Sequence, residues 1–187
     1  MIKRILIFLF SLIFSASFAQ WDSVKGGVRT NSTSYYGVAA EIIYNGDLYV
    51  GGMFDTVDHM PASGLAQWDG VNWNVFSKLN ITEKGEVVFA FANYNGNLVI
   101  GGSIDSVGGI SVADIAEWNG TTWSKLGQGI SGGWVDAMAV YNGNLYVGGT
   151  FTQTGSLYAS NIAMWNGSSW SLVGNGVFNK GAGIHKI

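Results

Sequence analysis

Alternating apolar positions mark the first strand of a unit that occurs three times along the chain. Residues 38–44, 88–94 and 135–141 each place valine, then alanine or isoleucine, then a final tyrosine at every second position. A period of two predicts a β-strand with these residues on one face. Because the intervening positions are also mostly apolar, we expect each strand to be buried on both faces.

Turn and strand signals follow each of these strands in the same order. Asn-Gly comes directly after the tyrosine and predicts a two-residue type I′ turn, since both residues tolerate positive φ. A short apolar segment ending in Gly-Gly predicts the second strand, and the paired glycines indicate a bend or a close approach of neighbouring backbone. A third strand ends in tryptophan, and a tight Asp/Asn-Gly turn leads to a fourth strand that begins with a second tryptophan.

The spacing of these residues is fixed inside each unit and variable between units. The first tryptophan lies 24 residues after the tyrosine in every copy, whereas the second tryptophan precedes the next tyrosine by 21 or 18 residues. This pattern indicates packed repeats at residues 35–80, 81–130 and 131–177, joined by loops. The recurring structural residues are Tyr44, Gly51, Gly52, Trp68, Trp73, Tyr94, Gly101, Gly102, Trp118, Trp123, Tyr141, Gly148, Gly149, Trp165 and Trp170.

A unit of about 50 residues with four strands and a diglycine is typical of a β-propeller blade. The sequence resembles the kelch and galactose-oxidase-like propeller superfamily over residues 21–177. It is especially similar to the Tyr-Asn-Gly-x-Leu-Tyr-Val-Gly-Gly and Trp-Asn-Gly-Ser-Ser-Trp repeats of large secreted proteins from Bacteroidetes-type bacteria. The resemblance implies an all-β partial propeller with three complete four-stranded antiparallel blades plus one N-terminal strand.

The two ends of the repeat region predict incomplete blades. Residues 21–28 align with residues 170–177, so we expect a lone fourth strand and a linker within residues 20–34. Residues 178–187 correspond to the start of a further blade. Since propellers typically have four to eight blades, we expect the N-terminal part of a longer protein. The alternative is a short intact chain that completes a ring by self-association through its open blade edges.

The first 19 residues have the pattern of a secretory signal peptide. Lys3 and Arg4 precede the apolar segment 5–14, and small residues place the expected cleavage between Ala19 and Gln20. The alternative is an uncleaved membrane anchor, but the apolar run is short for a membrane span. We therefore expect a secreted protein, in the periplasm, at the cell surface or outside the cell, with no membrane contact after cleavage.

Composition and charge argue against several classes of function. The net charge is −3 and no basic run occurs beyond the leader, which argues against a nucleic-acid partner. The chain has no cysteine, which excludes disulfides, a thiolate nucleophile and the Cys–Tyr crosslink of a galactose-oxidase copper centre. His59 and His185 have no partner at ligand spacing, so we expect no metal and no other cofactor.

The candidate chemistry favours binding over catalysis. Asp55 and Asp105 occupy corresponding loop positions, but the third copy has Gln153 nearby and no acid, so no ring of carboxylates is expected. We expect no enzyme, but a module that binds a protein or glycan through the variable loops 53–63, 103–113 and 150–160. The alternative is the non-catalytic portion of a secreted glycan-active enzyme.

Two further interpretations concern glycans. The tryptophans could form carbohydrate platforms, but their fixed recurrence favours packing within the blades. Three Asp-Ser/Thr-apolar triplets resemble the O-glycosylation sequon of Bacteroidetes-type bacteria. They predict modification at Ser23, Thr56 and Ser106.

Overall fold

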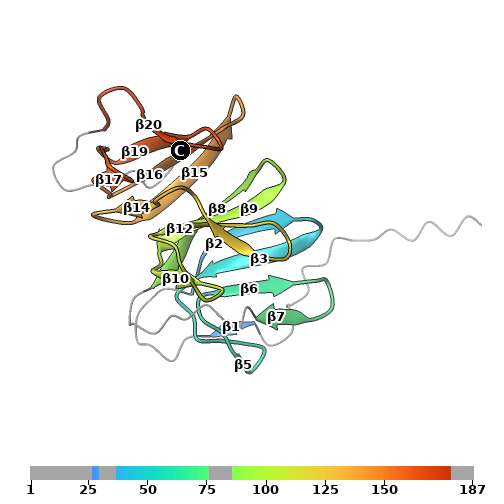
Figure 1. The fold of residues 1–187 in the computed structure, drawn as a ribbon. Coiled ribbons are helices and arrows are strands. Elements are labelled where there is room, and N and C mark those ends of the chain that lie inside the picture. Colours follow the sequence, from blue (N-terminus) through green and yellow to red (C-terminus); the bar gives the residue numbers. More distant parts are fainter. Residues whose placement is uncertain (1–26, 30–36, 76–85, 178–187) are drawn as a thin grey trace, which may run out of the picture.

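A computed structural model describes residues 27–29, 37–75 and 86–177, and within these ranges every regular element is a β-strand. No helix long and apolar enough to cross a membrane occurs in these ranges. Twelve of the described strands form three four-stranded antiparallel sheets, which follow one another in chain order (Figure 1). The remaining strands are two residues long and form three small sheets of two or three strands. The all-β expectation and the four-stranded antiparallel units are confirmed.

Each large sheet pairs its four strands in sequence order. The first sheet contains β2 (Val38–Tyr44), β3 (Asp47–Gly52), β6 (Leu65–Trp68) and β7 (Trp73–Val75). The second sheet contains β8 (Val87–Tyr94), β9 (Asn97–Ser103), β12 (Ile115–Trp118) and β13 (Trp123–Lys125). The third sheet contains β15 (Val135–Tyr141), β16 (Asn144–Gly149), β19 (Ile162–Trp165) and β20 (Trp170–Leu172).

The turns inside each sheet follow from two Asx-Gly signals. In the first turn of the second sheet both central residues have positive φ, 51° at Asn95 and 82° at Gly96, as a type I′ turn requires. The turn between the two tryptophans is longer and uses a side chain instead. In the third sheet Asn166 Oδ1 accepts hydrogen bonds from the N–H groups of Ser168 and Ser169, at 3.0 and 2.9 Å. In the first and second sheets, Asp69 Oδ1 and Asn119 Oδ1 accept the corresponding hydrogen bonds from backbone N–H groups.

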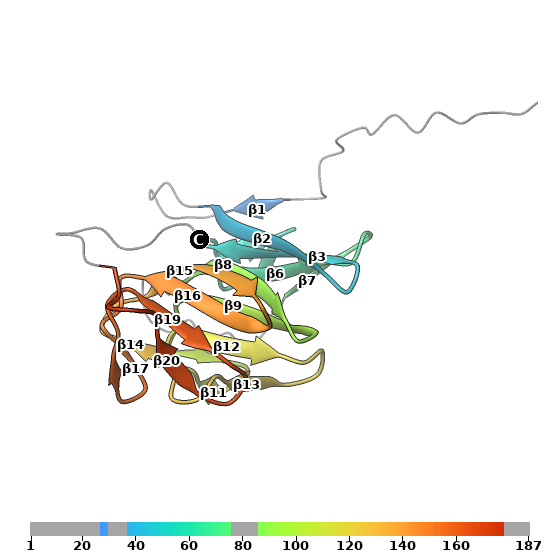
Figure 2. The same ribbon diagram turned by 90° about the horizontal axis from the view of Figure 1, so that it is seen from above.

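The three sheets pack on one another through their first strands. β8 contacts both β2 and β15, so the second sheet lies between the other two (Figure 2). One buried cluster joins the first and second sheets and includes Tyr44, Tyr49 and Val88. A second cluster joins the second and third sheets and includes Tyr94 and Val135. β8 is therefore covered on both faces, whereas β2 and β15 each have one face on which no described sheet packs.

The two glycines of each diglycine have different roles. A Cβ on Gly101 would lie 2.6 Å from Val135 Cγ1, so the first glycine permits close approach of the next sheet. A Cβ on Gly102 would lie 1.9 Å from the Val87 carbonyl oxygen, so the second glycine permits close approach of β8 within its own sheet. The expected close approach of neighbouring backbone is thus confirmed at Gly102.

Each first strand contains a β-bulge that the alternating pattern does not reveal. The register shifts at the same place in β2, β8 and β15, opposite the diglycine. One extra residue reverses the face to which the following side chains point. The expectation that the valine shares a face with the later residues is therefore wrong. Val88 packs on Gly51 of the first sheet, whereas Ala90 pairs with Gly101, which faces the third sheet.

Small strands occupy the segments for which the sequence indicated only loops. They are β4 (Thr56–Val57), β5 (Met60–Pro61), β10 (Ser106–Val107), β11 (Ile110–Ser111), β17 (Gln153–Thr154) and β18 (Leu157–Tyr158). Strands of two residues are too short to show a period, which is why the sequence does not reveal them. β14 (Ile130–Ser131) follows the second sheet in the chain but pairs with β17, so it connects the second and third repeats.

β1 (Val28–Arg29) pairs with β4 in the way that β14 pairs with β17. It is the described part of the segment expected to hold the N-terminal strand. The leader with Ala19 and Gln20, the site Ser23 and residues 178–187 lie outside the described residues. The described sheets form no closed ring, so the propeller stays a prediction.

Candidate functional site

The recurring tryptophans form one cross-strand pair in each sheet. Trp68 and Trp73 lie directly opposite each other, with ring centroids 5.5 Å apart. The corresponding separations are 5.1 Å for Trp118–Trp123 and 5.2 Å for Trp165–Trp170. The two rings pack on each other in every copy, and such aromatic pairs stabilise a sheet.

The recurring tyrosines connect consecutive sheets. The Tyr44 hydroxyl donates a hydrogen bond of 2.8 Å to the Gly96 carbonyl oxygen in the first turn of the second sheet. Tyr94 is equally buried, and its hydroxyl reaches the third sheet at Gly167. Tyr141 of the third sheet is exposed, because no described sheet follows it.

A hollow of about 350 Å³ lies between the second and third repeats, beside the third tryptophan pair. We call it the Trp165 hollow. Its walls come from the segment after β13, the β17–β18 turn and the β19–β20 turn. The lining residues are Gly127, Gln128, Thr154, Gly155, Ser156, Leu157, Trp165, Ser168, Ser169 and Trp170.

The Trp165 hollow combines aromatic rings with amide and hydroxyl groups. Trp170 Nε1 donates to the Leu126 carbonyl oxygen at 2.9 Å, so this N–H is already used within the protein. The amide of Gln128, which is exposed, remains as a polar group at the rim. Trp165 is buried, at 7% exposure, whereas Trp170 is half-buried, so Trp170 offers the more accessible ring. An aromatic ring beside a few polar groups is the kind of surrounding that binds small polar ligands, sugars among them.

Thr154 lines the same hollow and is fully buried, although its hydroxyl has no hydrogen-bond partner among the described residues. The corresponding residues of the first two repeats are Val57 and Val107, which are also fully buried. Thr154→Val should therefore raise the free energy of unfolding by about 1 kcal/mol, because it removes an unsatisfied hydroxyl and keeps the shape. Denaturant unfolding measures this. The reciprocal Val107→Thr should destabilise by a similar amount, and equal stability of all three proteins would contradict the argument.

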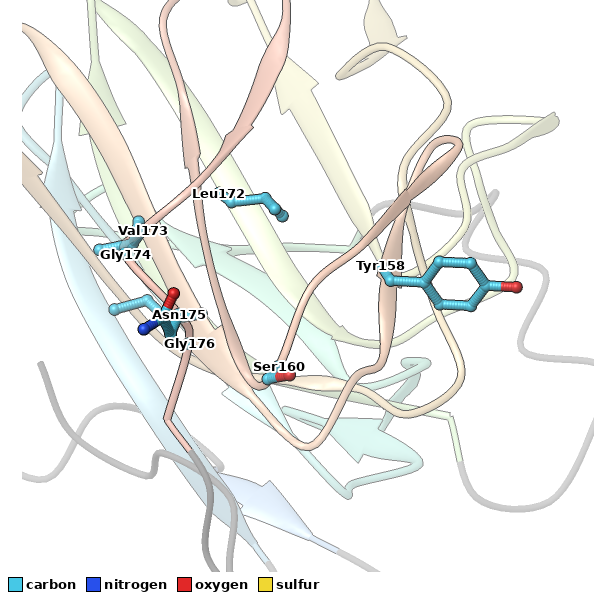
Figure 3. A pocket seen from close by; sticks show the side chains of 8 residues that line it. Tyr158, Ser160, Leu172, Val173, Gly174, Asn175 and Gly176 are labelled. Atoms are coloured by element: carbon cyan, nitrogen blue, oxygen red, sulfur yellow. The ribbon is translucent and has the colours of Figure 1, made fainter.

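A second hollow, of about 410 Å³, lies on the outer side of the third repeat (Figure 3). We call it the Val173 hollow. Val173 and Gly174 form one wall together with Leu172 and Asn175. Tyr158 forms the opposite side, and its ring points away from that wall into solvent.

Three carboxyl groups, those of Glu86, Asp105 and Asp114, lie near one another in the second repeat, although they are separated along the sequence. Glu86 Oε1 accepts a hydrogen bond of 3.1 Å from the Asp105 N–H, and Asp114 Oδ1 accepts one of 3.0 Å from the Ile104 N–H. Burial raises the pKa of Asp114 to about 7, against the effect of the Ile104 N–H. The negative charges of Asp105 and Glu86 raise it further. A signal existed: Asp114 stands where the other repeats have Gly64 and Asn161.

The remaining predicted sites are spread over separate parts of the structure. Thr56 and Ser106 begin the corresponding strands β4 and β10 and are half-exposed, and their glycosylation stays a prediction. Asp55 and Asp105 occupy corresponding positions before these strands, and the third copy has Thr152 there. His59 lies in the β4–β5 turn with φ of 64°. In the described ranges, no three His, Asp or Glu side chains group in a way that could hold a metal ion.

Comparison of the sequence with models of known protein families found no match, and comparison with curated proteins found none either. The kelch-like family therefore stays a prediction from the repeat.

Proposed function

We propose that this chain is a secreted or cell-surface module of repeated propeller-type blades that binds a ligand and catalyses no reaction. The Trp165 hollow carries the proposal. It places Trp165 and Trp170 beside the amide of Gln128 and the hydroxyl groups of Ser156 and Ser168. Its β17–β18 turn belongs to a segment that differs among the repeats, as a recognition surface on a fixed scaffold requires.

The chemistry of this hollow favours a glycan over a protein ligand. Sugars present apolar C–H faces, which stack on aromatic rings, and hydroxyl groups, which pair with amides and hydroxyls. The Trp165 hollow offers both kinds of group in one place. A protein ligand would be favoured by a wider apolar surface around these residues.

The carboxyl groups of the second repeat favour the alternative, a portion of a glycan-active enzyme. A carboxyl whose pKa is raised toward neutrality is the kind of group that acts as a general acid. Asp114, however, lines neither the Trp165 hollow nor the Val173 hollow. A binding module is therefore the better-supported proposal.

A glycan array with the full chain, run beside a reducing-end hydrolysis assay, tests this function. We expect binding of at least one glycan class without turnover. In calorimetric titration of that glycan, Gln128→Ala should weaken binding about 5- to 10-fold, because a hydrogen bond to the ligand is lost. Asn175→Ala is the matched control, since Asn175 holds the corresponding position after the third sheet and should leave affinity unchanged.

Two results would overturn the proposal. The first is an array on which the folded chain binds no glycan. The second is hydrolysis of a glycan that Asp114→Asn abolishes, which would show an enzyme instead.

A further inference from the structure

The stack of three sheets ends in two exposed faces that are opposite halves of one repeated interface. We call the face of each sheet that carries the recurring tyrosine the forward face, and the face that carries the first valine the rear face. Inside the molecule, the forward face of one sheet packs on the rear face of the next, first at Gly51–Val88 and again at Gly101–Val135. Within the part of the chain that the structure describes, the third sheet leaves a forward face open, and the first sheet leaves a rear face open.

The exposed fractions of the recurring tyrosine and valine differ between the packed faces and the open faces. Tyr44 and Tyr94 are each 2% exposed beneath the next sheet, whereas Tyr141 is 64% exposed. Val88 and Val135 are fully buried against the preceding sheet, whereas Val38 is 43% exposed. Among these equivalent side chains, those that a described neighbouring sheet covers are buried, and those without one are exposed.

The Val173 hollow is a second sign that no described sheet packs on the third one. In the second repeat the corresponding residues, Leu126 and Gly127, lie beneath the tryptophan pair of the third sheet. Leu126 is fully buried, and a Cβ on Gly127 would lie 3.0 Å from the ring of Trp165. In the third repeat Val173 and Gly174 line an open hollow of about 410 Å³ (Figure 3). The hollow has the place and lining of a receptor for part of another repeat.

We propose that two copies of this chain associate head to tail, with the rear face of the first sheet of one copy on the forward face of the third sheet of the other. We assign a second copy as the occupant, because the rear face of its first sheet is the complementary face that the described residues leave exposed. The contact would continue the two internal interfaces, so Val38 would lie on Gly148. The Tyr141 hydroxyl would donate to the Gly46 carbonyl oxygen, as Tyr44 does to Gly96 between the first and second sheets. Between the second and third sheets the Tyr94 hydroxyl has no hydrogen-bond partner among the described residues. Such an interface is heterologous, so it builds rings or open chains.

Two features of the first sheet limit the strength of this association. Glu41 stands on the rear face where the packed sheets have Phe91 and Met138, so docking brings a carboxylate against an apolar surface. Inside the molecule, β14, which follows the second sheet, pairs with β17 of the third repeat. In the proposed contact the segment after β20 of the other copy would pair with β4 in the same way, but β1 already pairs with β4. Residues 21–28 and 170–177 share their Trp, Val, Gly and Val positions, so one segment can replace the other.

Sedimentation velocity of the full chain, from about 1 μM to about 1 mM, tests the proposal. We expect the mean mass to rise with concentration. Val38→Glu on the rear face and Tyr141→Glu on the forward face should each weaken association on the order of 100-fold, because each would bury an unpaired charge. Both residues are exposed in the single chain, so both variants should fold, as circular dichroism will verify. Val71→Glu, in an exposed turn outside both faces, is the control that should leave association unchanged.

A mixing experiment identifies the head-to-tail arrangement. Each variant keeps one intact face, so Val38→Glu and Tyr141→Glu chains should form a one-to-one heterodimer when mixed, although neither associates alone. Glu41→Met, which restores the residue type of the internal interfaces, and Val28→Asp, which disfavours β1, should each strengthen association about 10-fold. A monomer at all concentrations, no recovery on mixing, or association unaffected by both glutamate variants would overturn the proposal.

Discussion

Gly102→Ala should lower the free energy of unfolding by about 3 kcal/mol. The added methyl group would lie 1.9 Å from the carbonyl oxygen of Val87 and 2.9 Å from its carbonyl carbon. Both atoms belong to the backbone of β8, which is packed between the first and third sheets and cannot move away alone. Chemical denaturation of both proteins, with the dependence of the free energy of unfolding on denaturant concentration fitted to the same slope, measures the change.

Gly37→Ala is the control for Gly102→Ala. Nothing lies within 4 Å of a Cβ built on Gly37, and its φ lies outside the left-handed region. We therefore expect a change within about 0.5 kcal/mol. If Gly102→Ala were as stable as the wild type, β8 and β9 would not approach each other at the bulge as closely as described.

Features that depend on local chemistry could be predicted from the sequence. The Asn-Gly turns require only two residues that tolerate positive φ, and the described φ values at Asn95 and Gly96 agree. The tryptophan pairs follow from a fixed spacing of five residues around a turn, so Trp118 and Trp123 lie opposite each other. The strands and their order within each sheet were predictable for the same reason.

Features that depend on pairing between distant segments could not be predicted. The bulge in β8 appears only when Val88 and Ala90 are paired with Gly102 and Gly101 of the neighbouring strand. β14 gains its strand character only from β17, which lies in another repeat. Alternation along one segment contains no information on such partners, so the face assigned to the first valine was wrong.

The Trp165 hollow and the carboxyl group of Asp114 were missed for a related reason. The hollow is built from three segments that the fold brings together, and burial of a side chain is a tertiary property. Position-by-position comparison of the three copies still carried a hint. Thr154 replaces Val57 and Val107, and Asp114 replaces a glycine and an asparagine, so both are departures within the repeat.

The carboxyl of Asp114 should make the protein less stable as the pH rises. Its pKa is about 7 in the folded protein, against 3.8 for an unperturbed carboxyl. Between these values the folded state keeps a proton that the unfolded state has lost. The free energy of unfolding therefore falls as the pH rises from about 4 to about 7, and it is constant with respect to this group at higher pH.

Asp114→Asn should remove this pH dependence and stabilise the protein by about 1–2 kcal/mol at about pH 8, with little effect near pH 4. The value is smaller than the full pKa shift implies, because water screens a partly exposed carboxylate. The third repeat already contains an asparagine at the position of Asp114. This residue, Asn161, donates a hydrogen bond of 2.7 Å from Nδ2 to the Val177 carbonyl oxygen. Urea denaturation at a series of pH values measures both effects.

Asp69→Asn is the matched control for Asp114→Asn, since Asn119 and Asn166 hold the corresponding position in the other repeats. The N–H groups of Asn72 and Val71 lower the pKa of Asp69. The stability linked to this carboxylate is therefore present above the unfolded pKa and is lost only as the pH falls through the folded pKa. Asp69→Asn should thus leave the dependence between about pH 5 and 8 unchanged. A wild-type stability that is flat from pH 4 to 8, or an Asp114→Asn protein less stable than wild type at pH 8, would contradict a raised pKa of Asp114 in the folded state.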